Sequence, residues 1–336
     1  MARCRKPTDQ DLMRLDAIAK HLKVRARYPD SSFNADVTAA CLTRIAPIID
    51  NLFPCTGEQI GLALGKHLCV TFEEVHDADD VEQIEERYLR GKREIGFAQL
   101  RAELRPEVDA LLFERMYATH DEPDHWVAVL NLQGSRARAY WNRFHEISHR
   151  IAEPPQGILP FRRHRFEATN PVEALIDSVA AEIAFYGPAF LPLIKRQRMR
   201  HARLDFNVID AIRQDYAPSA SLLSAANAVV KHWPAPAALL TAEYGGRTHS
   251  PDADRALRIK PQAYSKRATA AGLMLIPNMR VPAGSPINEA FRTGTEQGAA
   301  EHLGAWGTSQ GKHLSPIDVY TSARRLGERG YAVISA

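Results

Sequence analysis

The stretch NRFHEISHRIAE, residues 142–153, contains two histidines four positions apart, with a glutamate directly after the first. In an α-helix, positions i and i+4 project from the same face, so His145 and His149 can offer ring nitrogens to one Zn²⁺ while Glu146 borders the open coordination position. A zinc ion with three protein ligands keeps a fourth position for water and lowers the pKa of that water toward about 7. The pattern therefore predicts hydrolysis, with Glu146 as the general base that takes the proton of the water.

The pentapeptide alone is only moderately specific. A chain of this composition is expected to contain a random H-E-x-x-H about 0.03 times, and the alternative is an ordinary helix with two histidines on one face. The flanking residues favour a helix with one buried side, because Phe144, Ile147 and Ile151 recur at helical spacing. On that helix the histidines are expected to line a cleft.

A second helix carries the third ligand that a catalytic zinc needs. We expect this helix to begin at Asn170-Pro171, with the asparagine as N-cap and the proline in the first helical position. Glu173 lies 24 positions after His149, and Asp177 lies one turn further on. Glu173 is expected to complete the site, and Asp177 to accept the free ring N–H of a histidine. The alternative for Glu173 is a structural role in a capping box behind Asn170.

Three other carboxylates compete with Glu173 for the role of third ligand. Glu153 lies close to the end of the first helix, and Glu167 lies in the Pro/Gly/Arg loop between the two helices. Glu182 points to a different face of the second helix from Asp177. Glu173 is therefore the preferred ligand.

With both motifs considered, the sequence resembles the ImmA/IrrE family of metallopeptidases. In that family an H-E-x-x-H helix is followed by a helix with E-x-x-x-N/D and an A-A-x-(apolar)₂ run that ends at proline. The matching positions are His145, Glu146, His149, Glu173, Asp177, Ala180, Ala181 and Pro188. The match is close over residues 125–190, weaker to 245 and only architectural beyond. Ser148, Val179 and Tyr140 replace the usual glycine, phenylalanine and basic residue, so the identity of the substrate transfers less readily than the chemistry.

The resemblance implies a zincin-like core, a cytoplasmic location and cleavage of a helix-turn-helix transcriptional repressor after a stress signal such as DNA damage or phage infection. Residues 209–232, IDAIRQDYAPSASLLSAANAVVKH, resemble the helical module that follows the peptidase in radiation-response members, which end in a GAF-like sensor domain. Similar two-part proteases accompany CBASS anti-phage operons. We therefore expect an α+β protein with a zincin-like metallopeptidase domain (1–200), a helix-turn-helix-like segment (201–248) and a GAF-like mixed α/β domain (249–336).

The composition is that of an ordinary globular protein, with 45% hydrophobic and 25% charged residues. A formal net charge of +3 neither requires nor excludes a nucleic-acid partner. The 4 cysteines lie scattered in the first fifth of the chain, which suits reduced thiols in the cytosol better than a disulfide framework. The N-terminus lacks the apolar run of a signal peptide, and no stretch reaches about 18 apolar residues, so we expect a cytoplasmic protein without a membrane partner.

Hydrophobic periodicity predicts helices from about 8 to 65, including DQDLMRLDAIAKHL (9–22) and NADVTAACLTRIAPIIDNLF (34–53). Short apolar runs at 67–75, 110–116 and 125–132 predict strands, with a helix between the first two. The helix that begins at Pro171 is expected to stop at Gly187-Pro188, and a basic run at 194–203 to mark the next boundary. Two helices broken at Ala217-Pro218 follow, with few side chains suited to base edges. The last strand candidates are 256–265, 272–281, 317–326 and 331–336.

Side chains outside the metal pattern carry further predictions. Cys55, in the turn FPCTGE, is a candidate inhibitory thiolate at the fourth zinc position, with a plain loop cysteine as the alternative. Tyr140 and Tyr186 are candidate oxyanion donors on spacing alone. A basic run is a candidate nucleic-acid contact, with a solvated helix face as the alternative. Its residues are Lys195, Arg196, Arg198 and Arg200.

The leading hypothesis is a cytoplasmic zinc endopeptidase with Zn²⁺ on His145, His149 and Glu173, in which a C-terminal sensor domain regulates cleavage of a repressor. The competing hypothesis is a non-catalytic regulator that binds a repressor or nucleic acid and whose metal is structural or absent. Replacing Glu146 separates the two, because only the first hypothesis needs its carboxylate for chemistry.

Overall fold

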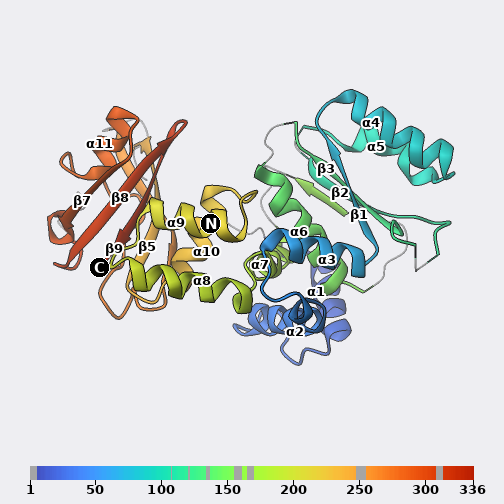
Figure 1. Cartoon of the computed structure of the whole chain (residues 1–336), viewed down its shortest axis with the longest axis horizontal. Coiled ribbons are helices and arrows are strands. Elements are labelled where there is room, and N and C mark those ends of the chain that lie inside the picture. Colours follow the sequence, from blue (N-terminus) through green and yellow to red (C-terminus); the bar gives the residue numbers. More distant parts are fainter. Residues whose placement is uncertain are drawn as a thin grey trace. The chain divides into compact units, whose positions relative to one another are not determined.

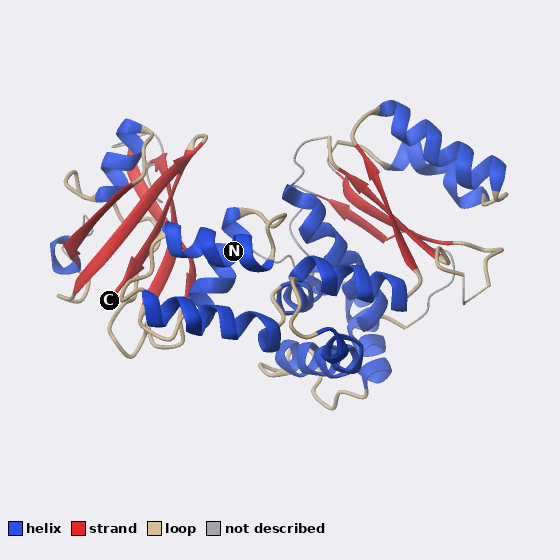
Figure 2. Ribbon diagram, viewed as in Figure 1, coloured by secondary structure: helices blue, strands red, loops and turns tan. Residues whose placement is uncertain are grey.

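The chain forms two compact units of mixed α+β structure (Figures 1 and 2). The computed structural model describes residues 6–106, 108–119, 122–133, 137–154, 161–164, 170–246, 255–307 and 313–336. The first unit comprises Met1–Ala189 with Ser219–Ser221, and the second comprises Phe190–Pro218 with Leu222–Ala336. The α+β class expected from the sequence is confirmed.

The first unit begins with three helices, α1 (Asp9–Leu22), α2 (Phe33–Ile49) and α3 (Gly57–His67), and a short 3₁₀ turn, η1 (Asp50–Leu52), follows α2. Capping boxes begin α1 and α3: Thr8 and Thr56 each accept a backbone N–H three residues on. The side chains of Asp11 and Gln59 reciprocate by accepting the backbone N–H of each cap. The helices predicted between about 8 and 65 are confirmed.

A four-stranded sheet in the order β1-β3-β2-β4 is the centre of the first unit. Its strands are β1 (Val70–Val75), β2 (Val108–Glu114), β3 (Trp126–Asn131) and β4 (Phe161–His164). β1 runs parallel to β3, and β2 runs antiparallel to both β3 and β4. The three predicted strands are confirmed, although the first starts at Val70 because α3 continues to His67.

The two faces of this sheet bury alternate side chains against different layers. Val127 and Val129 of β3 belong to a core with Tyr88 and Phe97, which come from the segments that cover one face. These segments are α4 (Ala78–Glu85), the π-helix η2 (Glu86–Gly91), the 3₁₀ turn η3 (Ile95–Gln99) and α5 (Leu100–Glu103). Ala128 of β3 faces the opposite core, on the side of α6 (Ala137–Ala152) (Figure 1). The sheet is therefore a rigid support for α6.

Helices α7 (Pro171–Ala184) and α8 (Gly187–Arg200) follow. Asn170 caps α7, as predicted: its side chain accepts the backbone N–H of Glu173 at 2.8 Å. The expected stop after α7 is confirmed, but the boundary expected at 194–203 is wrong for residues 194–200, which lie inside α8. Pro188 is the second residue of α8, where a proline fits because its missing N–H has no helical partner.

The second unit is built on a five-stranded antiparallel sheet in the order β6-β5-β9-β8-β7. Its strands are β5 (Ala237–Gly245), β6 (Ala256–Tyr264), β7 (Gln297–His302), β8 (Asp318–Leu326) and β9 (Arg329–Ser335). Helix α11 (Pro286–Thr293) packs on one face, and α9 (Phe206–Tyr216) and α10 (Leu222–His232) pack on the other (Figure 1). A 3₁₀ turn, η4 (Leu303–Ala305), follows β7.

Three of the four C-terminal strand predictions are confirmed, as β6, β8 and β9. The strand predicted at 272–281 is wrong: only Arg280 makes an isolated bridge, to Arg258. Gly272 and Asn278 both have positive φ, at 75° and 64°, which breaks an extended chain. Three described strands were missed: β4, which lies in the segment expected to be a Pro/Gly/Arg loop, and β5 and β7. β7 has the sequence QGAAEH, which lacks the β-branched and aromatic residues that signal a strand.

The segment expected at 201–248 as a helical module contains α9 and α10, which pack on each other, and also β5. Because β5 pairs with both β6 and β9, the described residues of this segment, apart from Ser219–Ser221, belong to the same compact unit as the C-terminal sheet. The range 1–200 likewise ends inside α8. Within the described residues, no single helix has the length and apolarity to cross a membrane, and the bent pair α7 and α8 meets that test only when both are counted.

Candidate metal centre

Helices α6 and α7 pack against each other and position the predicted ligands. The apolar stripe of α6 is buried as expected, with Phe144, Ile147 and Ile151 at most 4% exposed. On α7, Val179 and Ala180 are fully buried. The hydrophobic faces of both helices therefore set the rotation about each helix axis that turns the polar residues toward one another.

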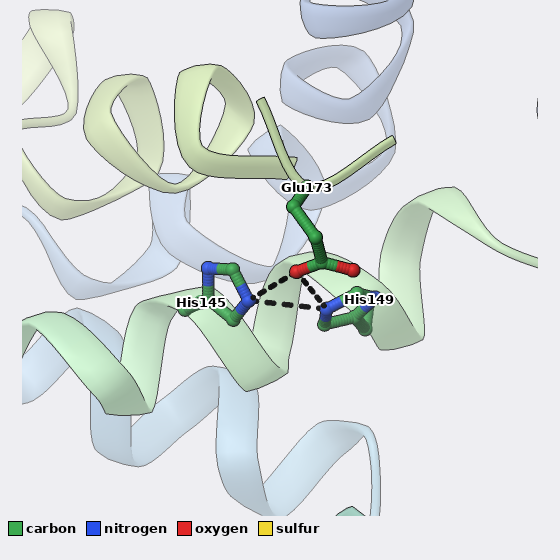
Figure 3. Close-up of side chains that lie close together, drawn as sticks. All are labelled: His145, His149 and Glu173. Atoms are coloured by element: carbon green, nitrogen blue, oxygen red, sulfur yellow. Dashed lines mark hydrogen bonds and ion pairs between the residues drawn. The ribbon is translucent and has the colours of Figure 1, made fainter. Parts of the chain in front are cut away.

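The side chains of His145, His149 and Glu173 converge on one point (Figure 3). The two Nε2 atoms of the histidines are 3.1 Å apart. Oε2 of Glu173 lies 3.2 Å from Nε2 of His145 and 3.6 Å from Nε2 of His149. Within the described part of the chain, these three residues are the group of His, Cys, Asp and Glu side chains close enough to share a metal ion.

The spacing of these three atoms fits tetrahedral zinc. Two ligand atoms 2.0–2.1 Å from a tetrahedral zinc stand about 3.3–3.4 Å apart, and the three observed distances lie on both sides of that value. The three atoms could therefore all act as ligands of one zinc ion at the usual distance of about 2.0–2.1 Å. The donor set of two imidazoles and one carboxylate is also that of catalytic zinc sites, so the residues fit the ion.

Each histidine is oriented by a carboxylate on its other ring nitrogen. Nδ1 of His145 lies 3.0 Å from Oδ1 of Asp177, as predicted. Nδ1 of His149 lies 3.1 Å from Oε1 of Glu153, and Arg14 of α1 donates to the same oxygen at 2.7 Å. A carboxylate at Nδ1 favours the tautomer that leaves Nε2 unprotonated for the metal. Both Nε2 atoms would therefore be available as metal ligands.

Glu153 has a different role from the one considered in the sequence. It was weighed only as a rival ligand, but its carboxylate lies behind His149 and is 2% exposed. The contribution of Arg14, 139 positions away, has no signal in the sequence. An acidic residue four positions after the second histidine was the available signal for Glu153, because i and i+4 side chains meet on a helix.

The other two rival carboxylates do not join the ligand group. Glu182 is half-buried on α7 and is not one of the three clustered residues. Glu167 lies outside the described residues. The structure shows what Glu173 does at the helix start. Its backbone N–H donates to the side chain of Asn170, while its carboxylate lies next to the ring of His145 and does not take the capping-box role. One residue therefore serves both the helix start and the cluster.

The ionisation of the cluster follows from its mutual contacts. Burial opposes protonation of His149, but the carboxylates of Glu173 and Glu153 outweigh burial and raise the pKa of His149 to about 10. Burial alone raises the pKa of Glu173, but His149 and His145 outweigh it, and this pKa lies well below its usual range. The carboxylate of Glu173 is therefore anionic and compensates the positive charge of protonated His149. A divalent cation between the two side chains could supply that positive charge instead.

Glu146, the predicted general base, is buried on the same helix as the two histidines. It lies on α6 between the two histidines and is 1% exposed. A carboxylate held in a site of low solvent access exchanges protons with a reacting water rather than with bulk solvent. Its place one residue after His145 is the one that the motif predicts for a general base, and this role remains a prediction.

The two tyrosines lie elsewhere in the first unit. The hydroxyl of Tyr140 donates to the backbone carbonyl of Ala184 at 2.6 Å, and the residue is 3% exposed. This hydroxyl connects α6 to the end of α7, which gives the oxyanion prediction for Tyr140 no support. The ring of Tyr186 stacks on Phe53, with centroids 6.4 Å apart. Burial and then Asp50 raise the pKa of Tyr186, and its role as an oxyanion donor remains a prediction.

Cys55 lies in the loop before α3 and is half-buried. It is absent from the group of side chains close enough to share an ion, and burial raises the pKa of its thiol. A raised pKa disfavours the thiolate that a zinc ligand requires. The structure therefore gives the inhibitory role of Cys55 no support, in contrast to the three ligands.

The predicted nucleic-acid contacts lie on α8. Arg196 pairs with Asp215 of α9 at 2.7 Å, and Arg198 donates to the carbonyl of His201 at the helix end. Lys195 and Arg200 are exposed. Two of the four basic residues thus have structural partners, as the alternative of a solvated helix face expects, and contact with nucleic acid remains a prediction.

Comparison with known proteins adds no identity to this geometry. No protein-family model matches the chain, and no curated protein matches its sequence.

Proposed function

We propose that this chain is a zinc-dependent endopeptidase with a zincin-like first unit. The observation that carries the proposal is the convergence of Nε2 of His145, Nε2 of His149 and Oε2 of Glu173 at tetrahedral spacing. The buried carboxylate of Glu146, next to the first ligand, adds the base that peptide hydrolysis needs. Two ligands on one helix and the third on the next helix are also the arrangement expected from the resemblance to the ImmA/IrrE family.

Bound zinc would polarise the scissile carbonyl and lower the pKa of water to about 7. The chain's own residues do the rest. His145, His149 and Glu173 would hold the ion, while Asp177 and Glu153 keep both histidine rings in place. Glu146 takes a proton from the attacking water and returns it to the leaving amide nitrogen. One carboxylate thus acts as base and then as acid.

The resemblance also supplies the proposed biology. The substrate would be a helix-turn-helix repressor, the signal a stress such as DNA damage or phage infection, and the location the cytoplasm. The second unit would be the GAF-like sensor, and its five-stranded antiparallel sheet with helices on both faces is compatible with such a role. The competing non-catalytic regulator needs the same partner but no general base.

Glu146→Gln tests the proposal, because it keeps the size of the side chain and removes the basic carboxylate. The full-length protein, loaded with zinc, is incubated with candidate helix-turn-helix repressors, and cleavage is followed by mass spectrometry. We expect the variant to retain near-stoichiometric zinc and lose at least about 100-fold in cleavage rate. Glu182→Gln, on α7 but outside the cluster, is the matched control. Equal cleavage by wild type and Glu146→Gln refutes Glu146 as the general base. Binding of the repressor without cleavage by the zinc-loaded wild type favours the non-catalytic regulator.

A further inference from the structure

The second unit contains a pocket of about 250 Å³ whose wall is basic and has no acidic residue. It lies where α8, the end of α10 and the turn after β6 meet. Its lining residues are Leu191, Lys231, His232, Trp233, Pro234, Lys266 and Arg267. Four of the seven carry a basic side chain, and two of the others, Leu191 and Trp233, are apolar surfaces.

The cations of this pocket have no internal counterions. Lys231, Lys266 and Arg267 make no ion pair and no side-chain hydrogen bond with any residue in the described ranges, and all three are exposed. By contrast, Arg196 and Arg324 in the same unit pair with Asp215 and Asp210. Three like charges around one small pocket repel one another, and a bound anion relieves that repulsion.

A buried donor lies in the same wall. Trp233 is 2% exposed, and its Nε1–H has no acceptor in the part of the chain that the structure describes. An indole N–H that is buried usually has a hydrogen-bond partner, so the unpaired donor of a residue that lines the pocket is a candidate contact for a ligand acceptor. The ring of His232 is fixed beside it by an edge contact with Phe190, with centroids 6.3 Å apart.

The backbone that carries the cations is firmly anchored. Ser265 donates its backbone N–H to Ala237 and accepts the N–H of Ala237 on its side chain, both at 2.9 Å. The turn is closed by the N–H of Ala268, which donates to the carbonyl of Ser265. Lys266 and Arg267 therefore start from a rigid turn, which lowers the entropy cost of holding a ligand between them.

One structural role explains part of the cluster. Lys231 and His232 lie in the last turn of α10, where basic side chains stabilise the helix dipole. That role does not extend to Lys266 and Arg267, which belong to a different element, nor to the unpaired indole of Trp233. The combination fits a ligand that offers several anionic oxygens.

We propose that this pocket binds a small phosphorylated organic anion. A phosphate group offers a double negative charge and several acceptor oxygens, which match the three cations and the indole N–H. The volume lies just below the usual range of about 300–1,000 Å³ for ligand pockets, which limits the ligand to about the size of a sugar phosphate. The site is independent of the metal centre and of the proposed peptidase activity.

Titration calorimetry of the full-length protein tests the site with ribose 5-phosphate, inorganic pyrophosphate, and ribose as the uncharged control. We expect saturable binding of both phosphates with a dissociation constant below about 1 mM, and none of ribose. Lys266→Ala combined with Arg267→Ala should weaken binding at least about tenfold, and Lys231→Met should weaken it independently. Lys260→Ala, which removes an exposed cation of β6 outside the pocket, should change it less than about twofold.

Trp233→Phe gives a second readout, because it removes the indole donor and one of the four tryptophan fluorophores. A ligand-dependent fluorescence change that disappears in this variant places the ligand at Trp233. Three results overturn the proposal: no saturable binding up to about 10 mM, an equal loss in Lys260→Ala, or binding of a single-stranded oligonucleotide without binding of either small phosphate. The last result assigns the surface to nucleic acid instead.

Discussion

Replacing Glu153 with alanine removes the carboxylate that holds the second histidine ligand. In the native protein, Oε1 of Glu153 lies 3.1 Å from Nδ1 of His149 and accepts from Arg14 at 2.7 Å. Without it, the ring of His149 loses the partner that favours the metal-binding tautomer, and Arg14 loses its ion pair. We expect zinc to bind more weakly, although no ligand has been changed.

The size of the effect follows from burial. Loss of a carboxylate behind a metal-bound histidine costs about 10–100-fold in affinity, or about 1.4–2.7 kcal/mol. The Glu153 side chain is 2% exposed, whereas that of Asp177 is 36% exposed. Water can replace Asp177 at His145 but has poor access to His149, so Glu153→Ala should have the larger effect of the two. Glu153→Gln keeps an acceptor oxygen and should lose less than about tenfold.

Competition with a chromophoric chelator at pH 7.5 measures the zinc affinity of each variant, and circular dichroism checks that the fold is retained. Glu182→Ala is the control for removal of an acidic side chain from the neighbouring helix. A dissociation constant for Glu153→Ala within about twofold of wild type contradicts the positioning role. An effect of Asp177→Ala larger than that of Glu153→Ala contradicts the argument from burial.

Three further predictions concern stability and the remaining candidates. Tyr140→Phe should lower the free energy of unfolding by about 1 kcal/mol, measured by urea titration, because the buried hydrogen bond to the carbonyl of Ala184 is lost. The variant should leave kcat unchanged. A large fall in kcat would instead support Tyr140 as an oxyanion donor. Asn170→Ala should lower the free energy of unfolding by about 1 kcal/mol. It should also weaken zinc binding in the chelator assay, because the Asn170 side chain holds the backbone N–H of Glu173. An unchanged zinc affinity would show that this N-cap does not contribute to the metal site. Burial raises the pKa of the Cys41 thiol from 9.0 to about 12. The unfolded chain therefore ionises this thiol at a lower pH than the folded protein does. The stability that the protonated thiol provides is complete below pH 9 and is lost as the pH rises toward 12. At pH 10.5 wild type should have lost about 2 kcal/mol more than Cys41→Ala, measured by urea unfolding at pH 8 and 10.5, and parallel pH profiles contradict this.

The ligands themselves were within reach of sequence reasoning. His145 and His149 are four positions apart on a strongly amphipathic helix, and Glu173 follows an N-cap and a proline that mark a helix start. Such signals involve residues within one or two helical turns, where the 3.6-residue period alone dictates which side chains share a face. The same locality explains the success with α1, β3 and β8.

The failures concern segments whose local signal conflicts with their surroundings. Residues 272–281, GLMLIPNMRV, are apolar enough for a strand, but the positive φ angles of Gly272 and Asn278 make them a loop. β7 has a weak signal and exists because β8 offers it a pairing edge. In the first case the backbone geometry outweighed the strand propensity of the residues, and in the second case the pairing with β8 did.

The candidate metal-binding group was therefore encoded in two short motifs, whereas its environment depends on contacts between distant segments. Arg14 reaches Glu153 across 139 positions, and Lys231 shares a pocket with Lys266 and Arg267 because a helix end and a turn meet. A ligand pattern repeats along one helix and can be read from spacing. Long-range pairs depend on how the buried faces of several elements pack together, which is a property of the whole chain and not of any one segment.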